Sequence, residues 1–348
     1  MDRVMRVLVV DDSAYVRKVV KQMLSKSPFL EVVGTARDGE EALDLVKELR
    51  PDVVTLDLIM PNMDGVEFLR RQMTLRPLPV VVVSIASESG EMALAALDAG
   101  AVDFVQKPTA LATDKIYEIS NELVEKVKTA ASVSVSRLKF APTDREKPTV
   151  LAAPVRTRGT VDIVVIGIST GGPQALKYLI PRLPADFPVP VAVVLHMPIG
   201  YTEMYARSLD AVSPLKVVEA AGDEPVRPGV VFIAPAGRHL KFQGNRERGV
   251  TTVLDARPFD TPHRPAVDVL FESAAQAFGE RVLGVVMTGM GADGRAGAAW
   301  IKAQGGLVFT EAEESCVVYG MPRSVAEAGL SDRVVALDRM AQAILETI

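Results

Sequence analysis

Five polar residues in the first third of the chain directly follow short apolar runs, and their side chains are suited to phosphate chemistry. They are Asp11, Asp12, Asp57, Ser84 and Lys107. Clustered carboxylates repel one another unless a cation lies between them, and an all-oxygen site favours Mg²⁺. Beside such a cation the Asp57 carboxylate can attack phosphorus and form an acyl phosphate. Lys107 would pair with the new phosphate, and the Ser84 hydroxyl would donate a hydrogen bond to it.

Asp11 and Asp12 also have a simpler interpretation. Aspartate is a common N-cap, and a helical pattern begins near Ser13. For one aspartate alone, capping would be the better explanation. Five such residues, at the ends of the first, third, fourth and fifth predicted strands, favour an acidic catalytic pocket.

A second candidate site is centred on Ser169, in the segment Gly-Ile-Ser-Thr-Gly-Gly-Pro at 167–173. An apolar run precedes this segment and a helical pattern follows it, which is the strand–turn–helix setting that exposes a nucleophilic serine. The glycines permit a tight turn, and free N–H groups at the helix start can stabilise an oxyanion. A glycine-rich turn binds phosphate at least as often, but this one lacks both Gly-x-Gly-x-x-Gly and the Walker lysine.

Serine needs a general base, and the chain contains three histidines. His196 follows the next apolar run and would reach the same sheet edge as Ser169. His239 lies in a polar, strand-like region and His263 lies among prolines, so we expect neither to be the base. Asp293, after a further apolar run, would orient the imidazole, and its alternative role is to cap the helix that follows it. His-x-x-His spacing is absent, so we expect no zinc and no other cofactor in this half.

Alternating strands and helices would position both sets of residues. Up to about residue 128, β-branched runs alternate with amphipathic stretches, and the runs are too continuously apolar for strands with one exposed face. We therefore predict an α/β domain with a doubly wound parallel sheet and its site at the carboxyl ends of the strands. The predicted strands are 7–10, 31–35, 53–56, 80–83 and 102–105.

The alternation resumes at residue 161 and predicts a second doubly wound, Rossmann-like domain. A section at 242–253, which contains Gly244–Asn245, predicts an inserted β-hairpin. The domains are expected at 1–128 and 161–348, joined by a proline-punctuated basic linker at 129–160. The predicted strands of the second domain are 162–166, 190–195, 230–234, 282–287 and 307–309, and its predicted helices are 172–180, 201–211, 265–278, 294–304 and 322–329.

Composition and charge exclude several classes of protein. The 348 residues carry a formal net charge of −5, so no overall basic field is available to hold a nucleic acid. Cys316 is the only cysteine, which fits a reducing compartment. No apolar run reaches 18 residues and no secretory signal pattern is present, so we expect no membrane insertion and a cytoplasmic location.

The motifs of the first domain resemble those of response-regulator receiver domains, across about residues 4–128. The matching segments are Val-Asp-Asp-Ser, Asp-Leu-Ile-Met-Pro-Asn-Met-Asp-Gly and Gln-Lys-Pro. The resemblance implies that Asp57 is the phosphoacceptor and that Ser84 and Phe104 form a switch pair. It also implies Mg²⁺ binding by Asp12, Asp57 and the carbonyl of Ile59, with Asp11 as a supporting carboxylate.

The second domain resembles the CheB-type chemotaxis methylesterases. The segment at 167–173 carries this resemblance together with Leu-His-Met-Pro, Thr-Gly-Met-Gly-Ala-Asp-Gly and Ser-Cys-Val-Val-Tyr-Gly-Met-Pro. It implies that Ser169 is the nucleophile, His196 the general base and Asp293 the orienting residue. The backbone N–H groups of Thr170 and Met290 are the implied oxyanion donors. The implied activity is hydrolysis of glutamate methyl esters, and deamidation of certain glutamines, on chemoreceptors, with a chemotaxis histidine kinase as phosphodonor.

Two other functions are alternatives to this one. A transcriptional response regulator would need a helix-turn-helix effector with a basic recognition face, whereas residues 161–345 show alternating strands and helices. A regulator that keeps the fold but binds a nucleotide or a protein without hydrolysis is the other alternative. Labelling of Ser169 by a serine-reactive phosphonate would distinguish it from an esterase.

Overall fold

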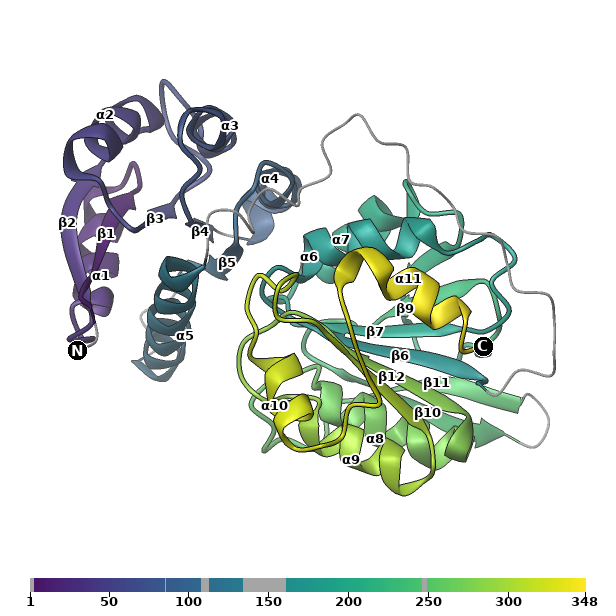
Figure 1. Cartoon of the computed structure of the whole chain (residues 1–348). Helices are drawn as coiled ribbons and strands as arrows, with labels where there is room; N and C mark the ends of the chain where they lie inside the picture. Colours follow the sequence, from purple (N-terminus) through teal and green to yellow (C-terminus); the bar gives the residue numbers. More distant parts are fainter. Residues whose placement is uncertain (1–2, 85, 108–112, 134–160, 246–248) are drawn as a thin grey trace. The chain divides into compact units, whose positions relative to one another are not determined.

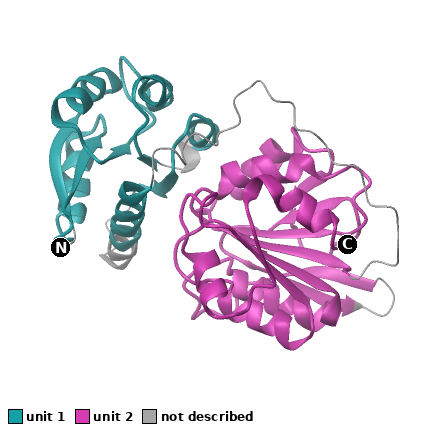
Figure 2. Ribbon diagram, in the orientation of Figure 1, with its two compact units in different colours: residues 1–141 teal, residues 142–348 magenta. Residues whose placement is uncertain are grey.

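The computed structural model describes residues 3–84, 86–107, 113–133, 161–245 and 249–348. The chain divides into two compact units, residues 1–141 and 142–348 (Figure 2). Most of the expected linker, residues 134–160, lies outside the described residues.

Unit 1 contains a five-stranded parallel sheet. Its strands are β1 (Met5–Val10), β2 (Leu30–Ala36), β3 (Val53–Leu56), β4 (Val80–Ser84) and β5 (Asp103–Gln106). Its helices are α1 (Ala14–Leu24), α2 (Gly39–Leu49), α3 (Gly65–Leu75), α4 (Ala86–Asp98) and α5 (Thr113–Ser132), so α5 extends four residues beyond 128. The strand order is β2-β1-β3-β4-β5, which places the reversal of strand order between β1 and β3. Ligands of doubly wound sheets bind at such a reversal.

Unit 2 contains a seven-stranded parallel sheet. Its strands are β6 (Ile163–Ile168), β7 (Val191–Leu195), β8 (Lys216–Glu219), β9 (Val230–Ile233), β12 (Val282–Val286), β13 (Leu307–Glu311) and β14 (Arg333–Val335). The order is β14-β13-β12-β6-β7-β9-β8, so β6 lies at the reversal with β12 and β7 as neighbours. Every residue of β6 is buried, as expected for a central strand covered on both faces.

Helices cover both faces of this second sheet (Figure 1). One face carries α6 (Gly172–Leu179), α7 (Thr202–Asp210) and α11 (Leu337–Leu345), and the other carries α8 (Val267–Phe278), α9 (Arg295–Ala303) and α10 (Met321–Glu327). Short 3₁₀ segments follow α6 and α8, at Ile180–Arg182 and Gly279–Arg281. Both units therefore have the predicted doubly wound α/β fold. No helix in the described part of the chain is long and apolar enough to cross a membrane.

The predicted hairpin is present and longer than expected. Strands β10 (His239–Asn245) and β11 (Gly249–Asp255) pair antiparallel, and Phe242 packs edge-on against Phe278 of α8 with ring centroids 5.6 Å apart. Gly244 and Asn245 pair with Val250 and Gly249, so both belong to strand β10.

In unit 2, two strands and one helix lie outside the predicted elements. Strands β8 and β14 have four and three residues, and each has charged or exposed positions that interrupt any apolar run. They lie at the two edges of the sheet, where only one strand neighbour is needed. The terminal helix α11 is amphipathic, and its pattern was overlooked.

Candidate functional site

The acidic residues of unit 1 meet at the carboxyl edge of its sheet. One carboxylate oxygen from each of Asp11, Asp12 and Asp57 lies within 4.8 Å of the other two. Asp11 follows β1 and Asp57 follows β3, and the Asp57 N–H donates to the Val10 carbonyl at 2.9 Å, which holds the two strand ends in register. Asp11 and Asp57 are buried, whereas Asp12 is exposed. Three carboxylates so close together form a donor set that suits a hard cation.

Lys107 lies between two of these carboxylates. Its Nζ is 2.9 Å from Asp11 Oδ2 and 2.7 Å from Asp57 Oδ2. Burial opposes the charge of Lys107, but the hydrogen bonds to Asp11 and Asp57 outweigh it and raise the lysine pKa. Burial raises the pKa of Asp57 despite the nearby ammonium. The Lys107 N–H donates to the Ser84 carbonyl at 2.8 Å, which brings the ends of β4 and β5 to the same pocket.

Three further residues were expected to belong to the phosphate site, and they come from β3, β4 and β5 or the residues just after them. Ser84 is buried at the end of β4. Phe104 is buried on β5, with the Lys126 ammonium 5.9 Å from its ring centroid. Ile59 lies two residues after Asp57, with an exposed side chain. The N-cap of α1 is Ser13, whose hydroxyl accepts from Val16 N–H, so neither aspartate is the N-cap, although Asp11 Oδ1 accepts the Ser13 N–H at 2.9 Å.

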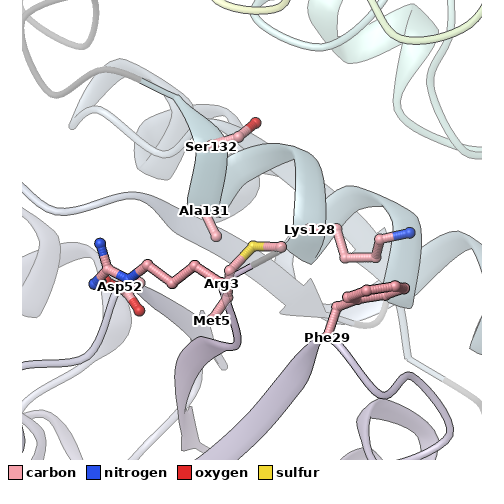
Figure 3. A pocket seen from close by; sticks show the side chains of 7 residues that line it. All are labelled: Arg3, Met5, Phe29, Asp52, Lys128, Ala131 and Ser132. Atoms are coloured by element: carbon pink, nitrogen blue, oxygen red, sulfur yellow. Dashed lines mark hydrogen bonds and ion pairs between the residues drawn. The ribbon is translucent and has the colours of Figure 1, made fainter. Parts of the chain in front are cut away.

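A cavity of about 420 Å³ also opens in unit 1 (Figure 3). It is lined by Arg3, Met5, Phe29, Asp52, Lys128, Ala131 and Ser132. Met5 begins β1, whereas Asp11 follows the end of that strand. This cavity is therefore separate from the acidic pocket.

In unit 2, Ser169 occupies the turn between β6 and α6. The Ser169 N–H donates to the Thr288 carbonyl at 3.0 Å. Gly171 has φ of 80°, and a Cβ there would lie 2.6 Å from Val317, so only glycine fits this turn. The His196 N–H donates to the Ile168 carbonyl at 3.1 Å, so Ser169 and His196 are the first residues beyond two adjacent strands.

The imidazole of His196 is held by Asp293. Its Nε2 lies 2.8 Å from Asp293 Oδ2, and both side chains are less than a tenth exposed. Its Nδ1 is buried and has no hydrogen-bond partner, and within the described residues no hydrogen bond joins the ring to Ser169. Because Nε2 is occupied by the carboxylate, Nδ1 is the nitrogen left to accept a proton.

The Asp293 carboxylate is also bonded to backbone groups. It accepts the N–H of Val267 at 2.8 Å and that of Asp268 at 2.9 Å, in the first turn of α8. Burial opposes its ionisation, but the hydrogen bond from His196 and these backbone bonds outweigh burial and lower the Asp293 pKa. The carboxylate is therefore ionised and fixed in orientation.

The alternative role considered for Asp293, capping of the following helix, is wrong. The N-cap of α9 is Gly294, with φ of 99° and no side-chain bond. Asp268 Oδ1 instead accepts the N–H groups of Gly294 and Gly297, at 2.9 and 2.7 Å. Asp268 was missed in the sequence, where the available signal was an aspartate in the first turn of a predicted helix.

The loop after β12 lies against the serine turn. A Cβ at Gly289 would lie 2.8 Å from Ser169 Cβ, so glycine permits this close approach of the two loops. The Thr288 hydroxyl donates to the Thr170 carbonyl at 3.0 Å and accepts the Val318 N–H at 3.0 Å. One threonine thus joins the segments that contain the two expected oxyanion donors.

A buried glutamate supports this junction. Glu311 Oε2 accepts the Thr288 N–H at 2.9 Å, and Oε1 accepts the Ser315 hydroxyl at 3.0 Å. The side chain is fully buried, and burial raises the pKa of Glu311 to about 7. Sequence reasoning missed Glu311, because a single glutamate at the end of a predicted strand carries no motif.

The other two histidines have different environments. His239 is fully buried, its Nδ1 accepts the Ala266 N–H at 3.1 Å, and burial lowers its pKa. His239 is therefore a neutral residue that binds backbone groups. His263 is stacked on His196, with ring centroids 4.1 Å apart and planes at 26°, so setting it aside overlooked a direct neighbour of the candidate base.

Known proteins match both units. The model of the CheB methylesterase family matches residues 164–344, and the response regulator receiver domain matches residues 7–118. A protein-glutamate methylesterase/protein-glutamine glutaminase of Myxococcus xanthus is 54% identical over 96% of this chain and 95% of its own length. The chain belongs to the CheB methylesterase family.

Further relatives support this assignment. A protein of the same name from Symbiobacterium thermophilum is 45% identical over 100% of this chain and 98% of its own length. The crystal structure of the Thermotoga maritima CheB methylesterase catalytic domain covers 54% of this chain and 99% of its own, with 43% identity and a TM-score of 0.53. The family expected from the motifs is confirmed.

Proposed function

We propose that this chain is a receiver-controlled serine hydrolase that removes methyl groups from glutamate γ-methyl esters of chemoreceptors. The observation that carries the proposal is the buried pair of His196 and Asp293 beside Ser169, at the strand-order reversal of the second sheet. The names of the relatives support the same substrate class. Glutamine deamidation fits the same site, because the amide presents the same carbonyl to a nucleophile.

In the proposed reaction, the Ser169 hydroxyl attacks the ester carbonyl while His196 Nδ1 takes its proton. The negative charge that forms on the carbonyl oxygen is stabilised by the backbone N–H groups of Thr170 and Met290. Collapse expels methoxide, which takes the proton from His196 and leaves as methanol. Water then attacks the glutamyl ester of Ser169, again with His196 as base, and releases the carboxylate product. Asp293 keeps the proton of the neutral imidazole on Nε2 throughout.

In unit 1, we propose that Asp57 receives a phosphoryl group from a chemotaxis histidine kinase. Asp12, Asp57 and the Ile59 carbonyl would hold Mg²⁺, with Asp11 as a supporting carboxylate. The three clustered carboxylates fit such a cation, which when bound would neutralise them and the incoming phosphoryl group. Lys107 already contacts the Asp57 carboxylate and is placed to pair with the phosphate. Ser84 and Phe104 would respond to the modification as the switch pair. Both reactions would take place in the cytoplasm.

The test is methanol release from a methylated chemoreceptor, by the wild type and by Ser169→Ala. The serine variant should lose at least several powers of ten in rate, because the attacking oxygen is removed. Asp338→Asn, an exposed change in α11, serves as the matched control and should keep the wild-type rate. Residual activity within tenfold of wild type in Ser169→Ala would refute the assignment of the nucleophile.

A further inference from the structure

Residues 256–266 connect the hairpin to α8, and the buried side chain of His239 holds this segment in place. The Nε2 of that ring lies 3.1 Å from the Pro258 carbonyl and 3.3 Å from Thr261 Oγ1. Its Nδ1 accepts the N–H of Ala266 at 3.1 Å. Because Nδ1 accepts, Nε2 carries the proton and donates. One side chain therefore holds the start, the middle and the end of this segment.

The same segment reaches the candidate base. His263 stacks on His196, and the carbonyl of the next residue, Arg264, accepts the Gly237 N–H at 2.9 Å. A Cβ at Gly237 would lie 3.3 Å from Ile199 Cδ1, and Ile199 is three residues after His196. A continuous series of contacts thus leads from His196 through His263, Arg264 and Gly237 to Ile199. We call the segments 197–200, 236–238 and 257–264 the rim.

The rim carries two exposed apolar side chains. Ile199 and Phe259 are each 68% exposed, and the other large hydrophobic residues of unit 2 given as exposed have lower fractions, from 45% to 58%. Phe259 is nevertheless held in place, because the Arg264 guanidinium lies 5.2 Å from its ring centroid and donates to its carbonyl at 3.2 Å. An exposed aromatic ring that is fixed in position, with an exposed aliphatic side chain on the same rim, is typical of an interaction surface.

The charge of the rim indicates the kind of partner. Arg238 and Arg257 are exposed and Arg264 is partly buried, whereas Asp260 is the one acidic residue within these three rim segments, all of which are described. Arg257 is partly compensated by Asp255, 3.6 Å away. A polypeptide with several methylatable glutamates carries a carboxylate wherever an ester has been removed. A cationic rim with two apolar side chains is therefore complementary to an acidic amphipathic segment.

We propose that the rim is the substrate-docking surface and that Phe259 and Ile199 anchor the acidic amphipathic receptor segment next to the scissile ester. The inference rests on the proposed function and adds to it the residues that select a protein substrate. The rim touches the polypeptide on either side of the ester, whereas Ser169 touches the ester itself. Loss of a rim anchor should therefore weaken binding of the receptor much more than reaction with a small ester.

The experiment compares two substrates for the full-length protein, methylated receptor and the γ-methyl ester of an N-acetylated glutamate amide. In Phe259→Ala and Ile199→Ala, KM for the receptor should rise about tenfold, with kcat within about twofold of wild type. The ratio of kcat/KM for receptor to that for the small ester should fall by a similar factor. Val334→Ala, on the edge strand β14 and 58% exposed, is the control and should keep the wild-type ratio.

Phe259→Glu provides a second variant that keeps a large side chain but adds a negative charge. It should raise the receptor KM more than Phe259→Ala, and the difference should shrink at high salt because ions screen the repulsion. If both Phe259 variants and Ile199→Ala keep the wild-type ratio of kcat/KM, the docking inference is overturned while the proposed function stands. If the wild type itself releases no methanol from the receptor, the docking inference and the proposed function are both overturned.

Discussion

Asp293 and Asp268 hold the starts of two neighbouring helices, each accepting backbone N–H groups from the helix that begins beside the other residue. Asp293 accepts from Val267 and Asp268 at the start of α8, and Asp268 accepts from Gly294 and Gly297 at the start of α9. Asp293, which we propose orients the imidazole of His196, is thus fixed by a reciprocal pair of helix caps. Its position depends on both helices at once.

Because Asp268 bonds to the start of α9, beside Asp293, replacing it by alanine or by asparagine should affect stability and kcat differently. Asp268→Ala should lower the free energy of unfolding by about 1–2 kcal/mol, because two buried N–H groups lose their acceptor. It should also lower kcat, since Asp293 loses its support. Asp268→Asn should remain near wild type, because both bonds go to Oδ1 and the amide oxygen can replace it. Urea unfolding and methanol release measure the two effects, and equal behaviour of the two variants would contradict this explanation.

The corresponding amide at Asp293 should not be tolerated. Oδ2 accepts from His196 and Val267, and Oδ1 accepts from Asp268, so an amide nitrogen in either position faces an N–H donor. Asp293→Asn should therefore lose stability and also favour the wrong imidazole tautomer, with a fall in kcat of about 10³–10⁴-fold. Single-turnover kinetics with the small ester measure this loss. A rate within tenfold of wild type would show that His196 needs no carboxylate.

Glu311 predicts a pH dependence of stability. Its folded-state pKa of about 7 lies above the ordinary value of 4.5. Between pH 4.5 and pH 7, Glu311 is therefore protonated in the folded protein and ionised in the unfolded chain. The free energy of unfolding should therefore fall as pH rises from about 4.5 to 7, by roughly 3 kcal/mol if no other group compensates.

Glu311→Gln should remove this contribution. The amide oxygen can accept from Thr288 N–H, and the amide nitrogen can donate to the Ser315 hydroxyl. The variant should be more stable than wild type at pH 8, with a difference that disappears towards pH 5. Trp300 is the only tryptophan and lies in unit 2, so its fluorescence during urea unfolding follows this unit alone. A difference that does not change with pH would exclude Glu311 as the titrating group.

Phosphorylation should act through Asp57. A small acyl phosphate with Mg²⁺ should increase methanol release by the wild type, and Asp57→Ala should stay at its basal rate because the acceptor carboxylate is absent. Removal of Mg²⁺ by a chelator should abolish the increase in the wild type. Asp44→Ala, an exposed aspartate in α2, is the control and should respond as the wild type does. An increase in Asp57→Ala would place the modified residue elsewhere.

Much of this protein could be predicted from local sequence. Continuous β-branched runs such as 53–56 and 163–168 specify buried parallel strands, because only a sheet covered on both faces accepts them. Residues that directly follow such strands reach one sheet edge, so Asp11 and Asp57 could be placed together without coordinates. The same reasoning placed Ser169 beside His196.

Only the tertiary structure decided how these residues are supported. The caps exchanged between Asp268 and Asp293, 25 residues apart, depend on two helices that start side by side. The stacking of His263 on His196 depends on a segment fixed by His239, and the sequence contains no periodic signal for such a contact. Glu311 supports Thr288 across adjacent strands, where spatial neighbours are distant along the chain. Local sequence patterns show which residues are buried and whether apolar residues recur with the period of a helix or a strand. Contacts between loops instead follow from the packing of the whole domain.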